Sequence, residues 1–168
     1  MSENALAVND NTELAVNDNT EEALNIVKNS TYAAIAAGII PIPLFDFLAV
    51  TGIHLDLLRR LSNLYGIEFS KNAGKNIIGA LTGGSLSSSL TPIFASTIKI
   101  VPVIGTTLGA VSSSIVSGAT TYALGKVFIQ HFASGGTFLT FDPKAVKEYY
   151  SEQLKEGKVV ATNAKVAA

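Results

Sequence analysis

Residues 77–127 read IIGALTGGSLSSSLTPIFASTIKIVPVIGTTLGAVSSSIVSGATTYALGKV, and this stretch is nearly free of charge. Lys99 and Lys126 are its only ionised side chains, and Lys99 divides it into two apolar arms, residues 77–98 and 100–125. Each arm is long enough to cross a hydrocarbon layer, which takes about 20 helical residues. The stretch therefore predicts a hydrophobic helical hairpin that lies in a membrane or docks on one.

The tip of this hairpin is expected at Lys99, Pro102 and Gly105, where a proline and a glycine interrupt the helical pattern. The positively charged residues outside the arms, among them Arg59 and Arg60, are expected on the cytoplasmic side of the membrane. Both termini then face the cytoplasm, and Lys99 must extend its side chain to reach the far interface. If the hairpin does not cross the membrane, the alternative location is the cytoplasm.

Glycines recur at four-residue spacing within the arms. Gly79 and Gly83 form one such pair, Gly105 and Gly109 form another, and Gly118 follows among serines. Rows of small residues let helix backbones approach closely in lipid, so the arms are expected to pack together and to support a homo-oligomer. The same rows would serve equally well in the core of a soluble helical bundle, and this alternative stays open.

The composition favours contact with a membrane. Charged residues make up 15% and hydrophobic residues 48% of the chain, whereas an ordinary soluble domain is roughly 25% charged. The net charge of −1 provides no general attraction to nucleic acid, which is not expected as a partner. The absence of cysteine excludes disulfides and thiolate chemistry. No basic segment precedes an apolar one near the start, so no secretory signal peptide is expected.

Residues 1–19 are expected to form a disordered tail. The octapeptide LAVNDNTE at 6–13 is repeated without change at 14–21, and such Asn- and Asp-rich duplications usually have no packed structure. A calcium loop is one alternative, since Asp10, Asn11 and Glu13 offer oxygens, but the glycine and spacing of an EF-hand are absent. A short docking motif for a partner is another alternative.

A first helix is expected to begin at Thr20, a good N-cap, and to end near Gly38. Pro41 and Pro43 then break the chain, because they remove two amide donors and favour extended geometry in the residues before them. Asp46 falls in the first turn of the next helix, where its carboxylate is expected to cap exposed amides.

The second helix is expected over residues 44–65, and its second half is amphipathic. One stripe of this half is apolar and is formed by Leu57, Leu58, Leu61, Leu64 and Tyr65. The residues away from this stripe are polar: Asp56, Arg59, Arg60 and Asn63. The two arginines could contact lipid phosphate or an acidic partner, and the alternative is a solvated helix face.

Gly66 ends this helix, and Ser70 is expected to cap the helix that leads into the first arm. A last helix is expected from Asp142 and Pro143 to Gly157, because these residues are typical of helix starts and stops. The predicted organisation is a tail at 1–19, a hydrophobic helical domain at 20–135, an amphipathic helix at 136–157 and a loose tail at 158–168.

Candidate chemistry is sparse. A phosphate-binding loop needs the pattern GxxxxGK[ST], but Lys126 is followed by valine and Thr120 stands where the first glycine belongs. Asp46 and His54 are eight residues apart, about 12 Å along a helix, which is too far for a direct hydrogen bond. His54 and His131 are expected at an interface or exposed, and two distant histidines give little support to a metal site.

Several segments resemble the YcjF-type, GTPase-associated domain of unknown function. The resemblance covers about residues 22–132 and is carried by AAIAAGIIPIPLFD at 33–46, LYG at 64–66, VPVIG at 101–105 and YALG at 122–125. It implies a helical, membrane-associated domain that lies beside or is fused to a Ras-like or dynamin-like GTPase. Members commonly carry a glutamine after the Asp block, where this chain has HLD at 54–56.

The sequence thus predicts an all-α protein of four to five helices, arranged as two hydrophobic helical hairpins joined by an amphipathic helix. The function expected is a non-enzymatic, membrane-associated interaction module that is a partner or anchor of a GTPase-type system. One alternative is a self-assembling helical hairpin protein that remodels or permeabilises bilayers, and another is a soluble helical scaffold. No catalytic residue, cofactor or metal ligand is assigned.

Overall fold

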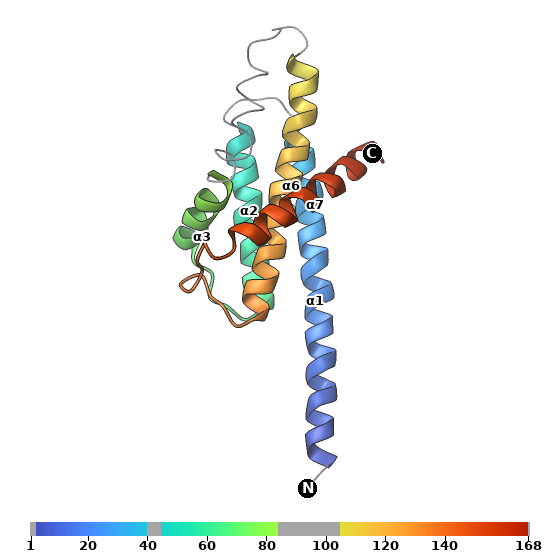
Figure 1. The fold of residues 1–168 in the computed structure, drawn as a ribbon, viewed down its shortest axis with the longest axis vertical. Coiled ribbons are helices and arrows are strands. Elements are labelled where there is room, and N and C mark those ends of the chain that lie inside the picture. Colours follow the sequence, from blue (N-terminus) through green and yellow to red (C-terminus); the bar gives the residue numbers. More distant parts are fainter. Residues whose placement is uncertain (1–2, 40–44, 84–104, 168) are drawn as a thin grey trace.

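The structure, a computed structural model, describes residues 3–39, 45–83 and 105–167, with side chains described for 19–39, 48–82 and 113–167. This part of the chain contains five α-helices and a π-helical turn, and no strand (Figure 1). The elements are α1 (Glu3–Ala37), α2 (Phe45–Leu64), α3 (Lys71–Ile78), the turn η1 (Gly79–Gly83), α6 (Gly105–Ala133) and α7 (Lys147–Val166). The prediction of an all-α fold with four to five helices is confirmed.

Three long helices form the body of the molecule. α1 runs antiparallel to α2 and α6, while α3 lies beside α2 and α7 crosses over α6 (Figure 1). α6 is the central helix, because it contacts α1, α2 and α7. The amino-terminal half of α1 extends beyond the other helices (Figure 1).

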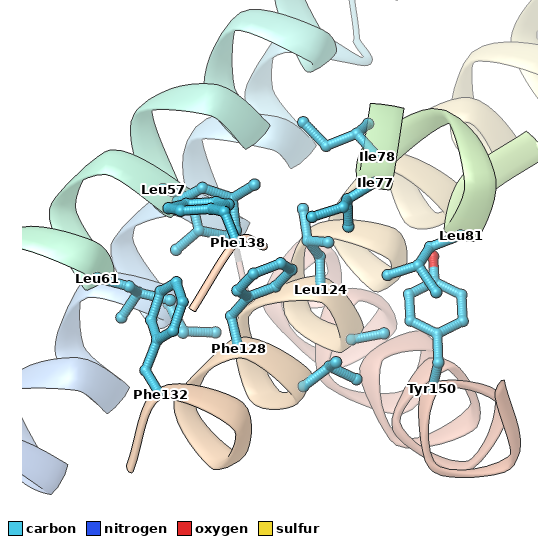
Figure 2. Packing of buried hydrophobic residues seen from close by; sticks show 14 of the residues in the cluster. Leu57, Leu61, Ile77, Ile78, Leu81, Leu124, Phe128, Phe132, Phe138 and Tyr150 are labelled. Atoms are coloured by element: carbon cyan, nitrogen blue, oxygen red, sulfur yellow. The ribbon is translucent and has the colours of Figure 1, made fainter. Parts of the chain in front are cut away.

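The core lies where α1, α2, α3 and α6 meet, and loop and α7 side chains complete it. Leu57, Leu58 and Leu61 are fully buried, and Leu64 and Tyr65 pack against the cluster, which confirms the apolar stripe predicted for this helix. Phe128 of α6 is fully buried near the centre of the cluster (Figure 2). Burying each such side chain stabilises the fold by about 1.5–3 kcal/mol before entropy is counted.

An aromatic cluster fastens the loop after α6 to the end of the bundle. The rings of Phe128 and Phe141 stack with centroids 4.7 Å apart, and Phe138 lies 5.4 Å from Phe132. His131 Nε2 forms a hydrogen bond of 2.9 Å with the carbonyl oxygen of Thr137. The loop is therefore held by side chains on its own preceding helix.

Glycines bring α1 and α6 into close contact. A Cβ atom at Gly118 would lie 2.6 Å from Cγ1 of Ile35, and one at Gly125 would overlap the side chain of Val27. Small residues at these positions thus permit the approach of the two helices. The contact lies within one folded chain and serves its core.

The ends of two helices differ from the prediction. α1 begins at Glu3 rather than at Thr20, so residues 3–19 are helical in the structure instead of forming an irregular tail. Thr20 lies in the middle of α1, where a capping side chain has no helix end to serve. By contrast, α2 agrees with the predicted helix to within a residue at each end, and Ser70 caps α3 as predicted, with its Oγ accepting from the Ala73 amide.

The prediction for the last helix was wrong at both ends. α7 begins at Lys147. Asp142 Oδ1 accepts a hydrogen bond of 2.9 Å from the amide of Lys144, as the predicted cap does, but the residues that follow it form a turn before the helix starts. The predicted stop at Gly157 does not occur, and α7 continues to Val166. The glycine has a packing role, since a Cβ atom there would lie 2.8 Å from the carbonyl oxygen of Ala119 on α6.

The prediction of a hairpin with two lipid-facing arms agrees only in part with the structure. In α6, residues such as Ala119, Ala123 and Leu124 are fully buried by helices of the same chain, so this half of the second arm is not surrounded by lipid. Across the described ranges, every helix is too short or too polar to cross a bilayer. The predicted tip at Lys99 and Pro102 lies outside the described residues.

Candidate functional site

Four helix ends without charge lie at one end of the bundle. They are the carboxyl end of α1, the amino end of α2, the turn η1 and the amino end of α6 (Figure 1). The uncharged runs are 29–39, 47–55, 76–83 and 105–125, with Asp46 at the start of α2 as the exception. We call this region the uncharged end.

Large apolar side chains are exposed at the uncharged end. Ile39 is 53% exposed and Leu48 is 64% exposed, and they flank the apolar Pro-Ile-Pro segment in the sequence. Large apolar side chains exposed in one region are typical of a surface that contacts something other than water.

α7 brings cations to one side of this region. Nζ of Lys165 donates a hydrogen bond of 3.0 Å to Oγ of Ser114, nine residues from the start of α6. Lys155 and Lys158 are exposed on the same helix. α7 thus carries positive charge along its exposed face and up to the level of the uncharged end.

The contact of α7 with the bundle includes buried polar groups without a partner in the described part of the chain. The hydroxyl of Tyr150 and Oε1 of Gln153 are buried with no hydrogen-bond partner among the described residues, which is costly for each group. Tyr122 of α6 donates a hydrogen bond of 2.7 Å to Glu156, and burial together with this carboxylate raises the pKa of Tyr122 above its usual value. Burial also raises the pKa of Tyr150.

A groove of about 460 Å³ lies between α1 and α2. From α1 it is lined by Asn29, Ser30 and Ala33. From α2 it is lined by Ala49, Gly52, Ile53, Asp56 and Arg60. The groove therefore has an apolar part towards the uncharged end and a charged part away from it.

Arg59 and Arg60 are both exposed, as the amphipathic pattern predicts. Nε of Arg60 lies 2.7 Å from Oδ2 of Asp56, one helical turn earlier, and both side chains remain about half exposed, at 57% and 52%. The pair forms the charged edge of the groove.

His54 was expected at an interface or exposed, and this was wrong. It is only 2% exposed, and its Nε2 lies 2.9 Å from Oγ1 of Thr121 on α6. Because the Thr121 hydroxyl donates to the carbonyl of Ser117 at 2.7 Å, it accepts from His54, which fixes the hydrogen on Nε2. Burial lowers the pKa of His54 to about 4. A polar side chain opposite it on the neighbouring helix could not be found from periodicity.

The remaining candidate residues are not brought together. Gly79 begins η1, and a Cβ there would meet nothing within 4 Å, so this glycine faces open space. Gly83 ends η1, while Gly105 and Gly109 lie in the first turns of α6, and their surroundings are outside the described side chains. Pro41 and Pro43 are outside the described residues, and Asp46 is described in its backbone alone, within the first turn of α2.

No described group of three His, Asp or Glu side chains is placed to hold a metal ion. The described side chains likewise assemble no nucleophile with a neighbouring base, since the one buried histidine bonds to a threonine that donates to its own helix. What the arrangement offers is surfaces: the uncharged end, the lysines of α7 and the groove.

The pattern of the family Domain of unknown function (DUF697) matches residues 6–158. The chain is also similar to the protein named Magnetosome membrane protein 22 from Magnetospirillum gryphiswaldense, with 40% identity over 142 residues, or 84% of this chain and 73% of that protein. No solved structure matches the chain. Since the family match extends over most of the chain and the relative aligns over a similar length, this protein belongs to the family DUF697.

Proposed function

We propose that this protein is a non-enzymatic, membrane-associated interaction module whose uncharged end enters one leaflet of a bilayer. The observation that carries the proposal is the gathering of four uncharged helix ends in one place, with Ile39 and Leu48 exposed there. The similar protein is named as a membrane protein, which agrees with this role.

The uncharged part of α1 suits one leaflet, whereas the uncharged part of α6, residues 105–125, is about twice as long. The uncharged part of α1, residues 29–39, has eleven residues and rises about 16 Å. This is about half of the ~30 Å hydrocarbon core. Lys28 and Lys126 lie beyond this depth, next to the facing pair Val27 and Gly125, where they would meet headgroups or water.

The apolar segments outside the described residues add to the proposal by sequence alone. Residues 40–44 connect α1 to α2, and 84–104 connect η1 to α6, and the helix ends that they join lie at the uncharged end. Only Lys99 is charged in these segments. The same orientation places the amino end of α1 on the cytoplasmic side of the cytoplasmic membrane.

The partner we propose is a GTPase of the kind that accompanies the YcjF-type domains that this chain resembles. The opposite half of the molecule is available to it, because Arg59, Lys71 and Lys75 are exposed there and α1 extends beyond the bundle. A homo-oligomer is part of the proposal. Gly118 and Gly125 already pack against side chains of α1 in the same chain. Self-association would therefore use Gly105 and Gly109.

A bilayer-permeabilising assembly is the second candidate, and the exposed apolar residues at the uncharged end are the observation that favours it. Leakage of dye from vesicles separates the two, because an anchored module leaves vesicles intact at high loading. A soluble scaffold is the third candidate.

Flotation with vesicles tests the proposal. Replacing Ile39 and Leu48 by aspartate should reduce the bound fraction at least about tenfold, since each buried apolar side chain contributes about 1.5–3 kcal/mol. Leu139, which is 91% exposed in the loop after α6, provides the matched control, and Leu139→Asp should float as the unaltered protein does. The proposal would be refuted if Ile39→Asp, Leu48→Asp and Leu139→Asp all floated equally well, or if the unaltered protein did not float. Purification in mild detergent tests the GTPase, which should co-purify.

A further inference from the structure

We infer that the groove between α1 and α2 binds one phospholipid whose headgroup carries a primary ammonium, with the acyl chain directed to the uncharged end. The inference rests on the proposed membrane association, which sets the direction of the lipid.

Small residues hollow out the groove. Ala33 on α1 faces Ala49 and Gly52 on α2, and a Cβ atom at Gly52 would meet nothing within 4 Å. A larger side chain at Gly52 would extend into this space. The groove has a volume of about 460 Å³ and is open to the outside, since most of the residues that line it are exposed.

The floor of the groove is suited to a hydrocarbon chain. Its part nearest the uncharged end is lined by Ala33, Ala49 and Ile53, and Leu48, 64% exposed, precedes Ala49 at its upper limit. From Ala49 to Arg60 the groove follows α2 for about 16 Å. A flexible apolar chain can lie along this length and leave at the uncharged end.

The charged edge of the groove complements both charges of such a headgroup. Asp56 uses Oδ2 and Arg60 uses Nε in their mutual contact of 2.7 Å, and both side chains are about half exposed, so a headgroup can reach both of them. The guanidinium suits a phosphate, and the carboxylate suits an ammonium. Asn29, in the groove lining opposite, adds an amide.

The polarity of the groove agrees with the proposed orientation in the membrane. A lipid in the leaflet has its chain towards the bilayer centre and its headgroup towards the cytoplasm. The groove has its apolar part towards the uncharged end and Arg60 away from it. A lipid can therefore enter without turning over.

The experiment uses monomeric dihexanoyl-phosphatidylethanolamine below its micelle concentration, with binding followed by amide NMR shifts on the full chain. We expect saturable shifts at Ala33, Gly52 and Asp56. Gly52→Leu should weaken binding at least about tenfold by filling the groove, and the matched control Gly79→Leu, at another open glycine, should not. Thermal unfolding of both variants verifies that they fold.

Headgroup recognition is tested separately. Arg60→Gln should weaken binding of dihexanoyl-phosphatidylethanolamine about two- to fivefold, the worth of an exposed ion pair. Asp56→Asn should remove the preference for this lipid over dihexanoyl-phosphatidylglycerol, which has no ammonium. Binding that is unaffected by Gly52→Leu, or shifts spread over the surface, would overturn the inference.

Vesicle flotation separates the two proposals. If Gly52→Leu floats normally but has lost the lipid, both proposals stand. If the unaltered protein fails to float yet binds the short-chain lipid, the membrane function fails and the groove stands. If it floats but binds no lipid in the groove, the inference fails alone.

Discussion

His54 of α2 and Thr121 of α6 are joined across the middle of the bundle by a hydrogen bond of 2.9 Å between Nε2 and Oγ1. Both side chains are buried, and the Thr121 hydroxyl donates a hydrogen bond to the carbonyl oxygen of Ser117. The bond requires a hydrogen on Nε2, and burial opposes a second proton on the ring. The central contact of the fold therefore depends on a neutral imidazole.

Stability should consequently fall with acidity. Because burial lowers the pKa of His54 from 6.5 to about 4, the unfolded chain binds a proton more readily, and stability is lost as the pH falls from about 6.5 to about 4. The loss should approach about 3 kcal/mol. Urea unfolding from pH 7.5 to pH 4 measures it. His54→Gln should flatten the profile in this window, and an unchanged slope would show that other groups cause it.

Gly125 should tolerate no side chain. Gly125→Ala should destabilise the fold by about 1–3 kcal/mol, because the new methyl overlaps Val27 in a close-packed core. Gly52→Ala, at an open helical position, should instead stabilise the fold by about 0.5–1 kcal/mol. Chemical unfolding compares them. Equal effects of the two substitutions would mean that α1 and α6 lie farther apart than described.

Gly157 should control the docking of α7. Gly157→Ala brings a methyl against the backbone carbonyl of Ala119, which cannot move aside, so α7 should separate from α6. We expect amide hydrogen exchange in α7 to rise at least about tenfold, as for a loss of about 1.4 kcal/mol in local opening. Exchange in α2 should stay the same and is the internal control. If α7 is instead a helix that ends at Gly157, alanine should slow exchange there.

The helical start of α1 should contribute little to the stability of the bundle. Deleting residues 6–13, the first copy of the octapeptide, removes a part of α1 that extends beyond the other helices (Figure 1). We expect unfolding free energy to change by no more than about 0.5 kcal/mol. Far-UV circular dichroism should lose about eight residues of helix. If the deletion leaves the helical signal unchanged, residues 6–13 are not helical and the expectation of a disordered tail holds.

Local signals predicted much of this fold. The stripe of Leu57, Leu58 and Leu61 and the cap at Ser70 depend on neighbours within one or two turns, which a sequence displays directly. Gly66 has a positive φ of 67° and follows α2, as a glycine at a helix end does. Such features need no knowledge of the partner helix.

The errors concern residues whose role is set by another helix. Gly157 is a residue type that commonly ends a helix, but here it packs against Ala119 and the helix continues beyond it. His54 has the hydropathy of an exposed residue, but Thr121 supplies a partner 67 positions away. The sequence shows that each of the four segments is uncharged. It does not show that they meet at one end of the bundle, because that depends on the antiparallel arrangement of the helices.

The two ends of α7 are secured unequally. At its start, the preceding loop is held by the stack of Phe128 on Phe141, while near its finish Lys165 reaches Ser114 through a hydrogen bond of 3.0 Å. Ser114 lies at the uncharged end, so the carboxyl end of α7 reaches the part of the molecule that would enter the membrane. Insertion should therefore separate this end of α7 from α6 first, because a lysine side chain extends from hydrocarbon to the headgroup layer, while the stacked rings keep the start of the helix in place.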